Sequence, residues 1–510
     1  MTVGTSGAKR LARTLLLACV LAVLAPASLW CSPEYRAVTL LYTNDTHGHL
    51  LPFSYPDPPD PSVVYASLPA IKDVGGIARR ATLARQIAGE MRGNTMLVDA
   101  GDVLDGTPFS IEYHGEADFA AMSSAGYQVM VPGNHEFNTS LEQFRWNIGT
   151  ASFPLVCANL LDRQTGNLLL PAYRTYDFQG ARVAVFGITV PSPEYKAAIE
   201  GLDFLDPYQV ARELVPKLKN QADIVIALSH LGVSEDVKLA EAVPGIDVIV
   251  GGHSHTRLAV PKFVRRAEQA HAFWVGGTVI VQAFEKGVEL GRLDLRLRRD
   301  GGPFTLMSYT GRLLPVTSEI PDDPSTAETV ARYYEPISKY YGDVIGEATA
   351  TLYDNRRTES AVLNLVADSI REAAGTQIAM YGVGGIRADI LQGEIRVWDV
   401  ATVLPFKNRI MALEMTGQRL KQGLKAFAPG VSGMRYRMVG DGIVEATVGG
   451  TPIDESATYE VATIDWLVGL YFSDVRVAKE LDIYSLGAVV NYIKARKVIS
   501  PVADGRRIIQ

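Results

Sequence analysis

The chain has 510 residues, of which 47% are hydrophobic and 21% are charged, and its net charge is −7. A chain of this length is too long for one hydrophobic core, so we expect at least two domains in an ordinary globular protein. The negative net charge provides no attractive field for polyanions, which disfavours nucleic-acid polymers and anionic membrane surfaces as partners.

Residues 1–31 have the features of an export signal. Basic residues precede an uninterrupted apolar run at 15–24, and the small residues Ala25 and Ala27 form a cleavage site. The run is too short for a comfortable membrane span. Cys31 stands where a lipoprotein carries its lipid, although the bulky Leu29 and Trp30 before it match that pattern poorly. We predict an exported protein, periplasmic or at the cell surface, with a soluble form favoured over a lipid-anchored one.

Residues 35–310 alternate apolar strand candidates with helical stretches. Runs rich in Val, Ile and Leu suit strands buried on both faces, and helices such as the one predicted at 76–91 would cover the sheet. A loop at 52–61 contains five prolines and is a candidate border of the functional site. The predicted strands are 37–42, 95–99, 128–131, 155–158, 183–187, 224–228, 247–250 and 278–281. This pattern predicts an α/β domain.

A helical connector is predicted at 318–342, beginning near Asp323, and a smaller α+β domain at 343–510. In the second domain, helices at 360–374 and 416–427 each carry one apolar face, and Gly375 ends the first of them. Short strands are predicted at 378–381, 409–415 and 459–463.

Polar residues that bind metals follow five of the predicted strands. The carboxyl ends of strands are where α/β sheets build their sites. Five of the eight histidines fall at these ends; one alone would most simply cap a carbonyl group, but five favour a shared site. The residues are Asp45, His47, Asp102, Asn134, His135, His230, His253 and His255.

This set of donors suits Zn, Mn, Co or Fe and does not choose among them. The carboxylate of Asp102 has two oxygens and can bridge two cations. Two ions roughly 3.5–4 Å apart can hold a phosphoryl oxygen, activate a water and orient in-line attack.

The motifs containing these residues together resemble those of calcineurin-like metallophosphoesterases. Two segments of the second domain, Gly384-Gly385-Ile386-Arg387 and Leu404-Pro405-Phe406, narrow the resemblance to the exported 5′-nucleotidase family. That family also contains UDP-sugar hydrolases and 2′,3′-cyclic-nucleotide 2′-phosphodiesterases. The resemblance implies a four-layer β-sandwich flanked by helices for residues 35–310, followed by a substrate-binding 5′-nucleotidase domain at 343–510.

The resemblance also implies two divalent metal ions that share Asp102. Asp45, His47 and His255 would complete one ligand set, and Asn134, His230 and His253 the other. His135 matches the family's catalytic histidine, which stabilises the transition state or the leaving alkoxide; the alternative is that it only supports a neighbouring ligand.

Asn138 departs from the family pattern. Nucleotidases of this family usually have aspartate at this position, where it orients and charges the histidine. An amide holds the ring but adds no charge. The version with Asn138 resembles the cyclic-nucleotide branch, whose strained substrate needs less help with its leaving oxygen.

Substrate-binding residues are expected in the second domain. Arg387 follows two glycines and offers a bidentate fork for phosphate, with a structural ion pair as the alternative. Arg356 or its neighbour Arg357 matches a second family arginine. Phe406 matches one of two rings that sandwich the nucleobase. The family's usual loop for the second ring is absent, which leaves Tyr471 or Phe472 as candidates.

The sequence thus predicts an exported dinuclear-metal phosphohydrolase that acts on small-molecule nucleotides as a 5′-nucleotidase. The enzymatic alternatives are a 2′,3′-cyclic-nucleotide 2′-phosphodiesterase and a UDP-sugar hydrolase. A non-enzyme alternative is a catalytically inactive protein that binds nucleotides or other solutes, which the altered base loop suggests. A ligand residue is present at every expected metal position, which argues against an inactive protein.

Overall fold

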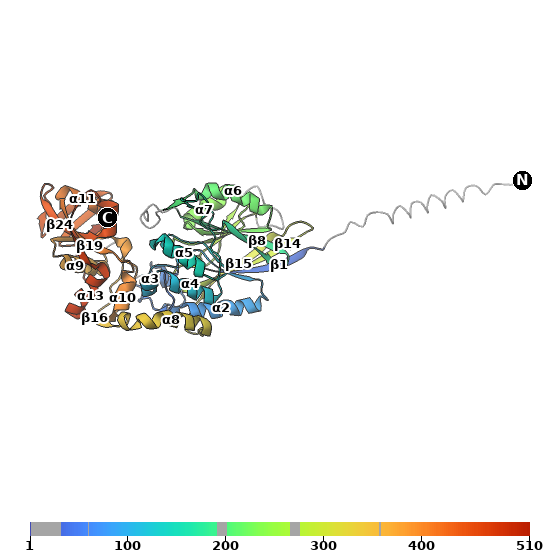
Figure 1. The fold of residues 1–510 in the computed structure, drawn as a ribbon, viewed down its shortest axis with the longest axis horizontal. Helices are drawn as coiled ribbons and strands as arrows, with labels where there is room; N and C mark the ends of the chain where they lie inside the picture. Colours follow the sequence, from blue (N-terminus) through green and yellow to red (C-terminus); the bar gives the residue numbers. More distant parts are fainter. Residues whose placement is uncertain (2–31, 60, 191–200, 266–275, 356–358) are drawn as a thin grey trace.

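A computed structural model describes residues 1, 32–59, 61–190, 201–265, 276–355 and 359–510 (Figure 1). The predicted export signal with Cys31 lies outside the described residues, as do Arg356 and Arg357. Across the described ranges, no helix is both long and apolar enough to cross a membrane.

Two β-sheets lie face to face in the first part of the chain. Their strand orders are β15-β14-β1-β4-β5 and β12-β13-β11-β10-β8-β7. Inner-face side chains such as Leu40 and Val98 from one sheet, and Val185 and Ile226 from the other, form one buried core. The strands are β1 (Glu34–Thr43), β4 (Thr95–Asp99), β5 (Val129–Met130), β7 (Tyr173–Phe178), β8 (Ala181–Thr189), β10 (Ile224–His230), β11 (Val248–Gly251), β12 (Lys262–Arg265), β13 (Gly277–Val281), β14 (Glu289–Arg299) and β15 (Thr305–Pro315).

Helices cover the outer face of each sheet. Helices α6 (Pro207–Lys219) and α7 (Val233–Ala242) lie on one side, while α2 (Ile77–Glu90) and α4 (Glu116–Ala125) lie on the other (Figure 1). The order of layers is therefore helix, sheet, sheet, helix. The predicted four-layer α/β sandwich is confirmed.

The predicted strands agree with the observed ones except at residues 155–158. There the chain makes only an isolated bridge, between Leu155 and Met130. The preceding Pro154 has no N–H, and the backbone N–H of Cys157 donates instead to a loop carbonyl at Pro171. The prediction of a strand at this position is wrong.

A second, smaller assembly surrounds a five-stranded sheet with the order β20-β17-β24-β19-β25. Helices α9 (Ala361–Ala374) and α13 (Ser485–Arg496) cover one face, and α11 (Gly417–Phe427) covers the other. Ser360 begins α9 by accepting a hydrogen bond from the N–H of Leu363, and Gly375, with a φ of +67°, ends it. The strands are β17 (Ile378–Tyr381), β19 (Arg409–Thr416), β20 (Gly430–Ser432), β24 (Thr458–Ile464) and β25 (Arg476–Tyr484).

Helix α8 (Pro324–Tyr341) runs along the first assembly and carries the chain to the second (Figure 1). As predicted, it begins at Asp323, whose carboxylate accepts a hydrogen bond of 2.9 Å from the N–H of Thr326. The Tyr341 hydroxyl donates to Glu112 at 2.6 Å. Trp398 of α10 (Val397–Val403) contacts the ring of Phe109. These contacts hold the two assemblies side by side.

The remaining elements include a four-stranded sheet, β23-β22-β21-β27, a three-stranded sheet, β18-β16-β26, and the two-stranded pairs β2-β3 and β6-β9. They are β2 (Pro52–Phe53), β3 (Val74–Gly75), β6 (Leu160–Asp162), β9 (Leu202–Phe204), β16 (Val344–Ala348), β18 (Gly393–Arg396), β21 (Met434–Val439), β22 (Gly442–Val448), β23 (Thr451–Pro452), β26 (Val498–Ile499), β27 (Arg507–Ile509), α3 (Pro108–Tyr113), α5 (Leu141–Thr150), α12 (Asp465–Tyr471), and the 3-10 turns η1 (Val64–Ser67), η2 (His135–Asn138) and η5 (Val383–Gly385).

Candidate metal centre

The loops that follow five strands meet at one end of the sandwich. Strands β1, β4 and β5 are parallel neighbours in one sheet, and β10 and β11 are parallel neighbours in the other. Their carboxyl ends therefore face the same way within each sheet. The eight side chains that the sequence places at these strand ends come together here.

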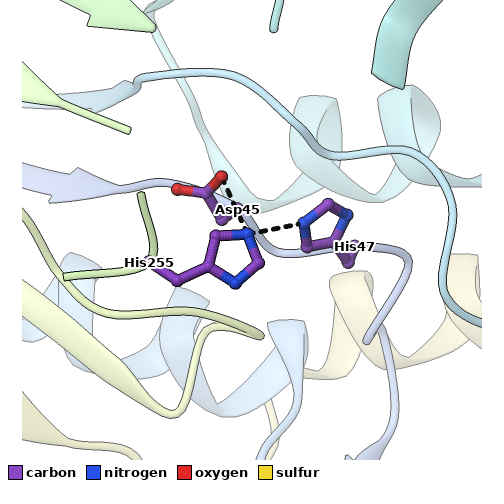
Figure 2. A group of neighbouring side chains, drawn as sticks. All are labelled: Asp45, His47 and His255. Atoms are coloured by element: carbon purple, nitrogen blue, oxygen red, sulfur yellow. Dashed lines mark hydrogen bonds and ion pairs between the residues drawn. The ribbon is translucent and has the colours of Figure 1, made fainter. Parts of the chain in front are cut away.

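Asp45, His47 and His255 form the first group, with their ligand atoms within 4.8 Å of one another. Figure 2 shows the ring of His255 between the other two side chains. Its Nε2 lies 3.1 Å from Nε2 of His47 and 3.3 Å from Oδ1 of Asp45.

Asp102, His230 and His253 form the second group, again within 4.8 Å. Nε2 of His230 lies 3.0 Å from Oδ2 of Asp102. Nδ1 of His253 lies 2.9 Å from the amide oxygen of Asn134. Asp102 also lies within the same limit of His47 and His135, so its carboxylate is located between the two groups.

The hydrogen bonds around three of the histidines leave their Nε2 atoms directed into the site. Nδ1 of His47 lies 2.9 Å from the carbonyl of Leu104, and Nδ1 of His230 lies 2.6 Å from the carbonyl of Ala100. Nδ1 of His255 faces the Glu285 carboxylate at 2.5 Å. Each of these acceptors requires a proton on Nδ1. The opposed Nε2 atoms are then electron-rich, and a positive species between them is favourable.

The charge state of the histidines agrees with this requirement. Burial would lower the pKa of His230, but the Asp102 carboxylate raises it to about 10. Burial likewise opposes the effect of Asp45 on His255, whose pKa rises to about 9. Burial lowers the pKa of His47 well below its usual value. His230 and His255 thus hold protons where a divalent cation would bind, whereas His47 is neutral, and such a cation would displace those protons.

The backbone is strained at several of these ligands. Their φ angles are positive, in the left-handed region that non-glycine residues rarely adopt, at a cost of about 1–3 kcal/mol each. A conformation of this kind persists only where the surrounding contacts impose it. The residues are Asp45 (+50°), His47 (+47°), Asp102 (+58°), His253 (+72°) and His255 (+49°).

Glu136 joins two of the ligand loops. Its buried carboxylate accepts hydrogen bonds from the N–H groups of Asp102 at 2.9 Å and Val103 at 2.8 Å, and also from that of Gly133. A Cβ on Gly133 would lie 2.6 Å from the backbone nitrogen of Asp102, so only glycine allows this approach. Sequence reasoning did not assign a role to Glu136, although it belongs to the motif that contains Asn134 and His135.

Glu285 is a second residue that the sequence reasoning missed. It follows β13, and its carboxylate holds Nδ1 of His255. The rule that identified the other residues, a polar side chain just after a buried strand, applies to it as well.

A cavity of about 520 Å³ lies between the two assemblies. His135 and Asn138 line it from the first, and Arg387 and Phe406 line it from the second. The ring of Phe406 lies 6.2 Å from that of His135, with an angle of 22° between the planes. Four residues predicted from distant parts of the sequence therefore border one space.

Tyr471 and Phe472 lie elsewhere. Phe472 is fully buried, and Tyr471 stacks on Phe427 with ring centroids 4.7 Å apart. Phe472 follows α12 and lies in the core, while Tyr471 is partly buried at the edge of the same core, and neither residue lines the cavity. Their positions do not support the predicted role as the second base-stacking ring. Trp466, in the first turn of α12, lines the cavity and is 43% exposed.

A second cavity, of about 700 Å³, lies beside the first group of ligands. Its lining includes Tyr55 and Pro56 of the proline-rich loop, Glu285, and Trp398 of the second assembly. Arg387 lines both cavities. As the sequence suggested, the proline-rich loop borders the site.

Comparison with known proteins agrees with this geometry. Residues 38–257 match the family described as calcineurin-like phosphoesterase, and residues 343–470 match the 5′-nucleotidase C-terminal domain. A 5′-nucleotidase of Vibrio vulnificus is 31% identical over 82% of this chain and 81% of its own length. The protein UshA of Yersinia enterocolitica is 28% identical, over 86% of each chain.

The crystal structure of a 5′-nucleotidase precursor from Thermus thermophilus superposes with a TM-score of 0.82 and 30% identity. The superposition covers 93% of this chain and 99% of the Thermus chain. Sequence, domain order and three-dimensional structure therefore agree over nearly the whole described chain. The chain belongs to the 5′-nucleotidase family of metal-dependent phosphoesterases, which combine a calcineurin-like domain with a C-terminal 5′-nucleotidase domain.

Proposed function

We propose that this protein is an exported phosphohydrolase that binds two divalent metal ions and removes phosphate from nucleotides. The observation that supports it most is the position of Asp102 between two groups of ligand atoms. Beside them, His135 and Arg387 face a cavity of about 520 Å³, and pockets of this size bind small molecules. The basic and apolar segments of residues 1–31 support export.

The side chains around the centre have separate tasks in this reaction. When bound, the divalent ions (Zn, Mn, Co or Fe) would hold the phosphoryl oxygens and supply an activated water for in-line attack. Arg387 would neutralise the negative charge that develops on the phosphoryl group, and the Asn134 amide would orient its neighbours. His135 would stabilise the oxygen that leaves with the nucleoside, and inorganic phosphate would be released.

Phe406 and Trp466 are the residues that we assign to the nucleobase. Both line the cavity that contains Arg387, so a base between the rings would place its phosphate toward the centre. A stacked base contributes about 1–3 kcal/mol to binding. This assignment replaces Tyr471 and Phe472 by Trp466, which lies in the first turn of α12 and lines the cavity.

Two observations favour alternative substrates. Asn138 resembles the residue of the branch that cleaves 2′,3′-cyclic nucleotides. The cavity of about 700 Å³ on the other side of Arg387 offers space for the second part of a larger diester such as a UDP-sugar. A catalytically inactive binding protein is less favoured, because the complete set of ligand residues would have no use.

Replacing Asp102 by asparagine should remove metal binding. We expect about two ions per chain in the parent and a clear loss in D102N, measured by elemental analysis. A metal at about 100 times its Kd stabilises the native state by about 2.7 kcal/mol, so Mn²⁺ should raise the parent's melting temperature but barely change that of D102N. The control is D203N, which makes the same change of side chain in the exposed ion pair between Asp203 and Arg163. Full metal content in D102N would contradict the assignment.

Phosphate release should distinguish the candidate substrates. With Mn²⁺ present, we expect a higher kcat/KM for AMP than for 2′,3′-cyclic AMP or UDP-glucose. The variant R387K keeps the positive charge but loses the bidentate fork. Because a hydrogen bond to a charged group contributes about 1.5–3 kcal/mol, kcat/KM for AMP should fall about 10- to 100-fold. A preference for the cyclic nucleotide would favour the second candidate. No turnover of any substrate by metal-loaded protein would favour a binding protein.

Removing the Trp466 ring should weaken nucleotide binding without changing the chemistry. In W466A we expect KM for AMP to rise about tenfold, as loss of one stacked ring predicts. KM for glycerol phosphate, which has no base, should stay unchanged. W146A removes an equally large ring, 60% exposed, from α5 and serves as the matched control. Equal KM values for AMP in W466A and the parent would exclude this residue from base binding.

A further inference from the structure

Asp105 lies between the metal centre and the cavity, in the loop that follows β4. Its Oδ2 is 2.9 Å from Nδ1 of His135, and the Asn138 amide donates a hydrogen bond to the same oxygen. The Asp105 side chain is 13% exposed and that of His135 8%. Both residues line the cavity of about 520 Å³. The pair is therefore largely shielded from bulk solvent but open to a bound substrate.

The loop holds Asp105 in a defined position. Its φ is +59°, and its backbone N–H donates to the Ser110 hydroxyl at 3.1 Å. The next residue, Gly106, has a φ of +149° and approaches the backbone of His47 so closely that a Cβ would collide with it. The carboxylate of Asp105 is thus fixed relative to the first group of ligands.

The hydrogen bond between Asp105 and His135 sets the direction of the His135 ring. Nδ1 faces Asp105, while Nε2 is directed to the other side, 4.0 Å from Oδ2 of Asp102. A carboxylate that accepts the Nδ1–H fixes the tautomer and the orientation of an imidazole. Nε2 is then directed to the region where the phosphoryl group and its leaving oxygen would lie.

The pair Asp105 and Asn138 is chemically complementary. One carboxylate oxygen accepts hydrogen bonds both from the imidazole and from the amide. A second carboxylate at position 138 would bring two negative charges into contact, which is unfavourable. Asparagine at position 138 is therefore compatible with aspartate at position 105, whereas aspartate at position 138 would be unfavourable.

We propose that Asp105 is the positioning residue of His135, supplying from the β4 loop the carboxylate that position 138 lacks, with Asn138 holding Asp105 in place. This inference rests on the proposed phosphohydrolase function and extends it to the leaving group. A His135 ring held in this orientation can assist a poor leaving group such as a 5′ alkoxide. The presence of Asn138 then does not restrict the protein to strained cyclic substrates.

The experiment exchanges the two side chains. D105N, N138D and the double variant D105N/N138D are compared with the parent on AMP, whose leaving alkoxide needs help, and on p-nitrophenyl phosphate, whose phenolate does not. General acid–base assistance typically contributes about 10²–10⁴-fold. We expect D105N to lose at least 100-fold in kcat on AMP and less than tenfold on p-nitrophenyl phosphate, with little change in KM.

The double variant should recover kcat on AMP to within about tenfold of the parent, because it again contains one carboxylate and one amide. N138D alone should be impaired, because two carboxylates then repel each other. Metal content and circular dichroism check that each variant is folded. If D105N keeps the parental kcat on AMP, the proposal is wrong. It is also wrong if kcat falls equally on AMP and on p-nitrophenyl phosphate and does not recover in the double variant.

A spectroscopic readout separates this proposal from the nucleotidase function. A proton on Nδ1 of His135 held by a carboxylate should give a downfield NMR signal in ¹⁵N-histidine-labelled protein, assigned by its loss in H135N. We expect the signal in the parent and in the double variant, but not in D105N. A parent that shows it without hydrolysing AMP would refute only the substrate assignment. An unchanged signal in D105N would refute the role of Asp105.

Discussion

The constraint on which this site depends is that electron-rich atoms are held face to face. Nε2 of His47 and Nε2 of His255 lie 3.1 Å apart, and Nε2 of His230 lies 3.0 Å from the Asp102 carboxylate. Such an arrangement is favourable only with positive charge between the atoms, whether protons or metal ions. The sandwich, the strained loops and the supporting carboxylates all serve to keep these atoms in place.

The scaffold achieves this through rigid, buried strands and through hydrogen bonds between loops. The strand ends on the two sheets fix where each ligand loop begins, and the core between the sheets prevents them from moving apart. Glu136 then ties the loop of Asp102 to that of Asn134 through backbone N–H groups, while Glu285 fixes the ring of His255. Positioned carboxylates of this kind orient metal-binding side chains.

Much of this was predictable from sequence because buried parallel strands have a clear signature and their carboxyl ends share an edge of the sheet. That rule identified residues as distant as Asp45 and His255. The hairpin of β14 and β15 was missed, because β14 alternates apolar and charged residues and β15 mixes apolar with small polar residues, so neither contains a long apolar run. The roles proposed for Asp105 and Trp466 were missed for another reason, because they depend on which neighbour lies opposite in space. Local pattern also pointed to Tyr471 and Phe472, which do not line the cavity, because it does not reveal which residues in and after α12 meet that space.

The most direct test of this account is a crystal structure of the Mn²⁺-loaded protein with anomalous diffraction data. Two anomalous peaks are expected, roughly 3.5–4 Å apart, one on each side of the Asp102 carboxylate. The first should contact His47 and His255, and the second His230 and His253. A single peak, or peaks away from Asp102, would contradict the claim that these strand ends form one dinuclear centre.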